Sequence, residues 1–205
     1  MKKNIPIKLS DYKPLPFLIP NINIDFNISK DKVVVQTLMF IKPKSEESFE
    51  LTLNGIEIEL LSVSIDGNEL GSEKYNLSDK DLVIKKTPTS EFELNIKSTI
   101  DPFKNTSLEG LYLSSGMLTT QCEAEGFRRI CFHPDRPDVL SKYTVRIEAD
   151  LNLYPILLSN GNKKYSGNVK NNNRHEIVWE DPFPKPSYLF ALVAGDLSLV
   201  SDKYI

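Results

Sequence analysis

Residues 21–28, NINIDFNI, decide the fold class of this 205-residue chain. Ile22, Ile24, Phe26 and Ile28 occupy every second position, and asparagine or aspartate stands between them. Successive side chains of a β-strand point to opposite faces, so alternation with period two is typical of a half-buried strand. The segment therefore predicts a strand with one face in a core and the other in solvent.

The same pattern recurs along the chain, and Asp66-Gly67 and Asn160-Gly161 add turn signals between the runs. No segment keeps helical periodicity for more than two turns, so we expect at most single helical turns, in residues 119–127 and 135–143. We predict an all-β, mostly antiparallel sheet or sandwich, and one domain over residues 1–205 because no linker divides it. The further strands are expected within residues 32–41, 49–53, 55–65, 81–86, 91–100, 143–152, 177–179 and 188–197.

The composition excludes several classes of partner. Hydrophobic residues make up 40% of the chain, and 25 basic against 28 acidic side chains give a net charge of −3. This balance argues against a nucleic-acid partner. No apolar run is long enough to span a membrane, and no secretory signal is recognisable, so we expect a cytoplasmic protein with reduced thiols at Cys122 and Cys131.

Residues 119–132, TTQCEAEGFRRICF, contain the most suggestive polar residues. Glu123 and Glu125 lie two positions apart and are candidates for the carboxylate pair of a glycoside hydrolase, but close carboxylates are common on surfaces. Arg128 and Arg129 follow them and can neutralise both charges. The pair alone is weak support for catalysis.

Two further candidate motifs, a zinc-binding motif and a cysteine nucleophile, each lack a residue that their chemistry requires. His175 begins HEIVW like a zinc-binding H-E-x-x-H, but Trp179 stands where the second histidine is needed and the segment alternates like a strand. Cys131 and His133 share a strand face, yet nothing in the sequence supplies an orienting group, so two buried thiols are the better interpretation. Taken singly, these motifs indicate neither a metal site nor a catalytic residue.

Four blocks, taken in order, carry a resemblance. They are GLYLSSGMLTTQCEAEGFRRI, DRPDVLSKYTVRIEAD, YPILLSNGN and WEDPFPKPSYLFALVAGDL. Together they resemble the amino-terminal domain of the aminopeptidase N family of zinc-dependent exopeptidases, and the bacterial enzymes most of all. The resemblance is dense over residues 110–197 and looser over residues 12–100.

The resemblance implies a saddle-like, β-rich domain packed on a thermolysin-like catalytic domain. In the family that second domain carries the G-A-M-E-N motif and the H-E-x-x-H zinc site, and neither motif occurs here. The resemblance thus implies that the catalytic domain and its zinc lie outside this chain, which alone would be inactive. In the complete enzyme, zinc would polarise the scissile carbonyl and activate water.

For the site, the resemblance implies that Glu123 binds the α-amine of peptide substrates with a free N-terminus, while Gln121 lines the pocket for the first side chain. A fixed carboxylate in a partly desolvated cleft suits an ammonium group. The resemblance further suggests a cis peptide bond between Glu123 and Ala124, and a bracing role for Glu125 through Arg128 or Arg129. The alternative is a stand-alone β-sandwich binding or interaction module without catalysis.

Overall fold

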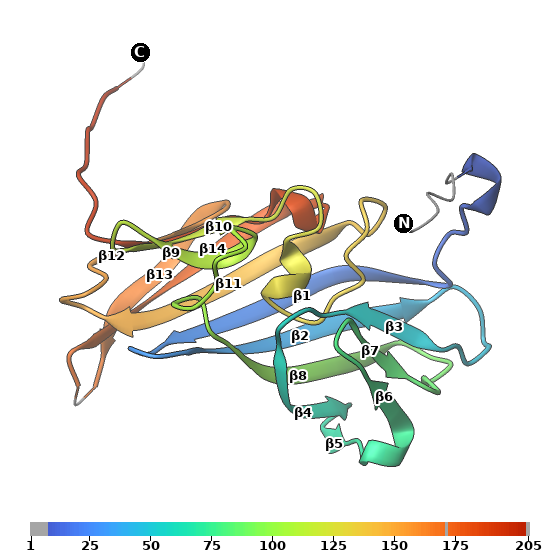
Figure 1. Ribbon diagram of the computed structural model, residues 1–205. Coiled ribbons are helices and arrows are strands. Elements are labelled where there is room, and N and C mark those ends of the chain that lie inside the picture. Colours follow the sequence, from blue (N-terminus) through green and yellow to red (C-terminus); the bar gives the residue numbers. More distant parts are fainter. Residues whose placement is uncertain (1–7, 171, 204–205) are drawn as a thin grey trace, which may run out of the picture.

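The chain folds into three β-sheets joined by turns and loops (Figure 1). The computed structural model describes residues 8–170 and 172–203. Within these ranges the helical elements are four 3-10 turns of three residues each. The predicted all-β fold with only short helical turns is confirmed. The 3-10 turns are η1 (Leu9–Asp11), η2 (Ser72–Lys74), η3 (Phe127–Arg129) and η4 (Ser187–Leu189).

The largest sheet has eight strands in the order β13-β14-β11-β1-β2-β8-β4-β5. Strands β1 and β11 pair in parallel, and the other neighbours pair antiparallel. The strands are β1 (Phe17–Ile28), β2 (Val33–Pro43), β4 (Glu59–Ile65), β5 (Asn68–Glu69), β8 (Phe92–Ile100), β11 (Ser141–Asp150), β13 (Asn162–Val169) and β14 (Arg174–Lys185).

Two smaller sheets complete the molecule. A four-stranded sheet in the order β12-β15-β10-β9 lies near β11, β13 and β14, and a three-stranded sheet in the order β3-β7-β6 lies towards the other end (Figure 1). Their strands are β9 (Gly110–Ser114), β10 (Met117–Gln121), β12 (Ile156–Ser159), β15 (Leu192–Gly195), β3 (Leu51–Asn54), β6 (Tyr75–Leu77) and β7 (Asp81–Ile84).

Strand β1 shows why the sequence folds in this way. Ile22, Ile24, Phe26 and Ile28 are at most 1% exposed, while the polar side chains between them face the other side of the sheet. Full burial of one such side chain contributes about 1.5–3 kcal/mol, which sets the register of a strand with one apolar face. The predicted alternation of residues 21–28 is confirmed.

Two of the expected strands begin later than predicted. The alternation from residue 55 predicted a strand, but the amides of Gly55 and Ile56 bind the carbonyls of Lys80 and Arg128, so β4 begins only at Glu59. Residues 188–197 also predicted one apolar strand. There the amide of Phe190 closes η4 onto the carbonyl of Ser187, and β15 starts at Leu192.

The turn predictions also needed correction in part. Gly161 adopts the positive φ of +88° that a turn requires, but this turn joins β12 to β13, which belong to different sheets. A helical turn was expected over residues 119–127, whereas β10 continues to Gln121 and η3 starts at Phe127. The 135–143 segment holds a hydrogen-bonded turn from Val139 to Arg136 and no 3-10 or α-helix.

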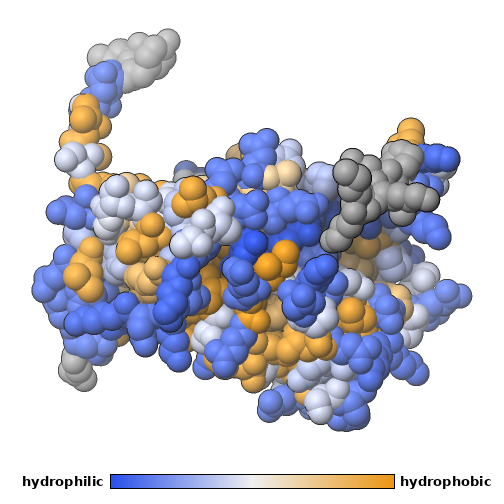
Figure 2. All heavy atoms as spheres, viewed as in Figure 1, coloured by the Kyte–Doolittle hydropathy of each residue, from blue (hydrophilic) through white to orange (hydrophobic). Residues whose placement is uncertain are grey.

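Most of the visible surface is polar (Figure 2). Apolar side chains gather on this face around the four-stranded sheet and again over the lower part of the molecule (Figure 2). Leu113 of β9 and Leu158 of β12 are 41% and 38% exposed, and Leu153 before β12 is 48% exposed. The four-stranded sheet therefore presents several leucines to its surroundings. In the described residues, no helix is long and apolar enough to cross a membrane.

Candidate functional site

The turn after β10 carries the residues that the sequence singled out. β10 ends at Gln121, and the amide of Gly126 donates to the carbonyl of Cys122 at 2.9 Å, which closes the turn of residues 122–126. The Glu123–Ala124 peptide bond is cis, as the resemblance suggested. The turn of residues 122–126 thus connects β10 to η3.

Gly126 holds this turn against the neighbouring strands. A Cβ atom at this position would lie 2.2 Å from the carbonyl oxygen of Gln121 and 3.0 Å from the amide nitrogen of Gly110. No side chain fits in that space, so glycine is required there by close backbone approach. The next residue, Phe127, is fully buried and anchors the turn in the core.

The structure brings Gln121 and Glu123 together. The side-chain amide of Gln121 donates from Nε2 to the backbone carbonyl of Glu123 at 3.0 Å, and both residues are exposed. Within residues 8–170 and 172–203 the Glu123 carboxylate has no hydrogen-bond or ion-pair partner. An exposed carboxylate on a well-defined turn is free to accept hydrogen bonds from a cationic ligand.

Glu125 and the two arginines have different partners. Glu125 Oε2 lies 3.2 Å from Arg128 Nη1, which confirms the contact expected for this glutamate. Arg129 turns the other way, and its guanidinium pairs with Glu57 at 2.6 Å and with Glu109 at 3.2 Å. The two glutamates of the turn are therefore not equivalent, because only Glu125 is engaged.

The cysteines and His133 lie in a low-dielectric interior. Burial raises the pKa of the Cys122 thiol to about 12, with the charge of Asp135 adding to the effect, and burial raises the pKa of Cys131 well above its usual value. Burial also lowers the pKa of His133 to about 4. Both thiols are thus protonated and the imidazole is neutral near pH 7. These groups suit a core and not a thiolate nucleophile.

His175 has a structural contact at the start of β14. Its Nε2 lies 2.7 Å from the carbonyl oxygen of Tyr154, which is a hydrogen bond in the tautomer protonated at that nitrogen. Among the residues described, no group of three histidine, cysteine, aspartate or glutamate side chains could hold a metal ion. The part of the chain seen here therefore does not fit a zinc site.

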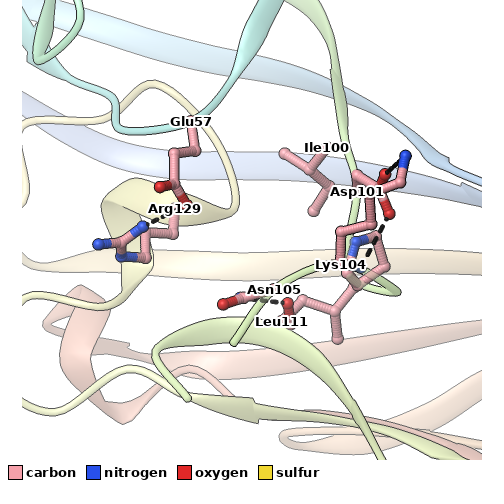
Figure 3. A pocket seen from close by; sticks show the side chains of 8 residues that line it. Glu57, Ile100, Asp101, Lys104, Asn105, Leu111 and Arg129 are labelled. Atoms are coloured by element: carbon pink, nitrogen blue, oxygen red, sulfur yellow. Dashed lines mark hydrogen bonds and ion pairs between the residues drawn. The ribbon is translucent and has the colours of Figure 1, made fainter. Parts of the chain in front are cut away.

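A hollow of about 280 Å³ lies beside Arg129 and does not include Gln121 or Glu123. Arg129 and Glu57 point toward one another on one side, and Lys104 and Asp101 pair on the other (Figure 3). Its four charged groups are already paired with each other. The hollow consequently offers little free charge to hold a ligand.

Sequence reasoning missed Asp135 near this turn. The residue is buried, and its carboxylate lies 3.0 Å from Arg128 Nε and 2.5 Å from Ser187 Oγ. In the sequence it was part of an expected helical turn, with no local sign of burial. Ser187 is 52 residues away, so no short-range pattern could have indicated the contact.

Comparisons with known proteins agree with this fold. The family described as "Peptidase M1 N-terminal domain" matches residues 12–189. Aminopeptidase N of Caulobacter vibrioides is 46% identical over 199 residues, which cover 97% of this chain and 23% of that relative. Aminopeptidase N of Escherichia coli K12 is 43% identical over 194 residues, which cover 95% of this chain and 22% of that relative.

Solved structures give the same result. The crystal structure of Legionella pneumophila aminopeptidase A in complex with aspartic acid matches with a TM-score of 0.87 and 36% identity, over 94% of this chain and 23% of that one. An M1 zinc metallopeptidase of Deinococcus radiodurans shares the fold with a TM-score of 0.73 at 12% identity, over 88% of this chain and 42% of that one.

These matches identify the class of protein: an all-β amino-terminal domain of a zinc metallopeptidase. The chain belongs to the peptidase M1 family, as its N-terminal domain. It spans 22 to 23% of the length of the bacterial aminopeptidases that it matches.

Proposed function

We propose that this chain supplies one wall of the substrate cleft of a zinc aminopeptidase that releases N-terminal amino acids from peptides. Glu123 accepts hydrogen bonds from the substrate's α-ammonium group, and Gln121 lines the pocket for the first side chain. Zinc, when bound by another part of such an enzyme, supplies the hydrolytic chemistry. The residues of this chain bind and orient the peptide.

The observation that carries the proposal is the free carboxylate of Glu123 on a well-anchored turn. Its exposed side chain has no partner among the residues described, while the neighbouring Glu125 is paired with Arg128. An ammonium and a carboxylate form a charge-assisted hydrogen bond, which contributes about 1.5–3 kcal/mol. A peptide with a blocked N-terminus lacks that contact, so the same group selects substrates with a free N-terminus.

Packing on a catalytic domain is supported by exposed leucines in and beside the four-stranded sheet. Leu113, Leu153 and Leu158 are 38–48% exposed. Apolar side chains gathered on one part of a surface favour contact with another protein surface. The same sheet contains β10, which leads into the Glu123 turn. A domain that packs near this sheet would place its own groups close to Glu123.

The test uses a chimaeric enzyme, in which this chain replaces the matching segment of Escherichia coli aminopeptidase N, 43% identical to it. Activity of the unmodified chimaera establishes that the chain replaces that segment. Glu123→Gln removes the charge with little change in volume and is expected to raise KM roughly tenfold to a hundredfold, as loss of a charge-assisted hydrogen bond implies.

Glu125→Gln is the matched control in the same turn, and its KM should stay within about twofold because its exposed pair contributes little. Equal KM values for the Glu123→Gln variant and its parent would exclude the proposed amine contact. The isolated chain should not hydrolyse an aminoacyl chromogenic substrate when zinc is added. EDTA-sensitive turnover by the purified chain would contradict the assignment of the chemistry to another part of the enzyme.

A further inference from the structure

The turn that carries Glu123 leads directly into η3, and the buried carboxylate of Asp135 binds η3. Asp135 Oδ2 accepts hydrogen bonds from the backbone amide of Arg128 at 3.2 Å and from its Nε at 3.0 Å. Arg128 Nη2 also donates to the Asp135 carbonyl at 3.1 Å. The backbone and the side chain of Arg128, five positions after Glu123, thus both bind Asp135.

Burial makes the contact between Arg128 and Asp135 a stronger restraint than an ion pair on the surface. The side chain of Asp135 is 1% exposed and that of Arg128 is 17% exposed. A buried carboxylate needs hydrogen bonds for both of its oxygens, and loss of one partner leaves an uncompensated charge. By contrast, Glu125 is 71% exposed, so its pair with Arg128 adds little restraint on its own.

Two distant segments hold Asp135 itself. Ser187 of η4 donates from Oγ to Asp135 Oδ1 at 2.5 Å, and Oδ1 of Asn54 at the end of β3 accepts from the Asp135 amide at 3.1 Å. Asn54 in turn donates to Asp81 of β7 at 2.9 Å. Asp135 therefore ties η3 to the three-stranded sheet through its backbone amide, and to the segment that enters β15 through its carboxylate.

Arg129 restrains η3 from the outer side. Its guanidinium reaches Glu57 and Glu109, as Figure 3 shows for the Glu57 contact. Both glutamates are more than half exposed. Solvent weakens these pairs, so the inward contact of Arg128 with Asp135 provides the stronger restraint on η3.

We propose that Asp135 is a positioning residue for the Glu123 carboxylate, acting through Arg128 and η3, with Ser187 orienting Asp135. This inference rests on the proposed function, because it assumes that Glu123 binds the substrate amine. Asp135 lies in the interior, where its side chain is out of reach of a substrate. Its role is to keep the base of the turn in place, so that the carboxylate meets the ammonium in one geometry.

The test measures KM, kcat and thermal stability of the chimaeric enzyme with Asp135→Asn and with Ser187→Ala. Asp135→Asn keeps the size but removes the charge that holds Arg128. Ser187→Ala removes one hydrogen bond and leaves the ion pair, so it provides a milder variant if Asp135→Asn fails to fold. Arg146→Gln is the matched control, since Arg146 forms ion pairs with Glu148 and Glu176 on the large sheet.

We expect Asp135→Asn to raise KM roughly tenfold and Ser187→Ala roughly threefold, within the hundredfold that a misplacement of about 1 Å can cost. The inhibition constant of a competing free amino acid should rise in parallel, while kcat per active enzyme stays within about twofold. Arg146→Gln should leave KM and the inhibition constant unchanged. This division between KM and kcat separates positioning from a purely structural role, which would lower only the amount of active enzyme.

The two proposals fail in different ways. If Glu123→Gln raises KM while folded Ser187→Ala and Asp135→Asn variants keep the parental KM, the positioning role is wrong and the amine contact stands. If Ser187→Ala lowers thermal stability with KM unchanged, the network is structural only and the inference is overturned. If Glu123→Gln itself leaves KM unchanged, the proposed function fails, and the positioning role fails with it.

Discussion

His133 makes the stability of this domain depend on pH. Its side chain is fully buried, with its ring edge-on to Phe127 at 5.2 Å between centroids, and neither ring nitrogen has a hydrogen-bond partner of good geometry among the described residues. Burial lowers its pKa from 6.5 to about 4, although the Asp135 charge and the Pro134 carbonyl oppose this shift. The folded state therefore resists protonation that the unfolded state accepts.

The sign and size of the effect follow from this shift. Because the folded pKa is depressed, stability is complete above the unfolded value of 6.5 and is lost as pH falls through about 4. Between about pH 7.5 and pH 4.5, the free energy of unfolding should fall by roughly 2–3 kcal/mol from this residue alone. For a chain of this length, that corresponds to a melting temperature lower by about 5–10 °C.

His133→Leu isolates this contribution, because leucine has a similar volume and cannot be protonated. Chemical denaturation of the parent and the variant at several pH values gives both stability curves. At neutral pH the two should be similar, since replacing unpartnered buried nitrogens by apolar groups is nearly neutral. Toward pH 4.5 the parent should lose roughly 2–3 kcal/mol more than the variant. Two parallel curves would refute the burial argument.

Two further predictions concern the Glu123 turn and the thiols. Gly126→Ala should lower the free energy of unfolding by about 2 kcal/mol, because its Cβ would lie 2.2 Å from the Gln121 carbonyl oxygen. In urea denaturation, the exposed Gly67→Ala should cost only about 1 kcal/mol, and equal losses would contradict the crowding argument. Cys122 and Cys131 should resist a thiol reagent at pH 8 until the chain unfolds, when both react. Rapid labelling of the folded chain would contradict their burial.

The alternation of β1 and β11 was readable from the sequence because a half-buried strand needs one apolar face. Every second residue from Ile22 to Ile28 and from Tyr143 to Ala149 lies buried, as the pattern predicted. Local patterns could not show which strands pair. The parallel pairing of β1 with β11 joins residues more than a hundred positions apart, and the separation of β12 from β13 depends on partners elsewhere in the chain.

The candidate site was predictable from the sequence only where its residues lie in one contiguous segment. Gln121 and Glu123 were identified by a resemblance carried by a contiguous block, and the structure places Gln121 at the end of β10, hydrogen-bonded to Glu123 in the turn that follows. Asp135 and Ser187 could not be predicted, because their contact joins distant parts of the chain and the sequence around each residue does not indicate it. The strand expected over residues 55–65 begins only at Glu59 for a similar reason, since the amides of Gly55 and Ile56 donate to the distant carbonyls of Lys80 and Arg128.

The most direct test of the proposed contact between Glu123 and the substrate amine is one distance in a crystal structure of the chimaeric enzyme with a free amino acid bound. If Glu123 binds the substrate amine, one of its carboxylate oxygens lies about 2.7–2.9 Å from the α-nitrogen, as a charge-assisted hydrogen bond requires. The proposed contact would be contradicted if the Glu123 carboxylate pointed away from the α-ammonium and only groups outside this chain bound that ammonium.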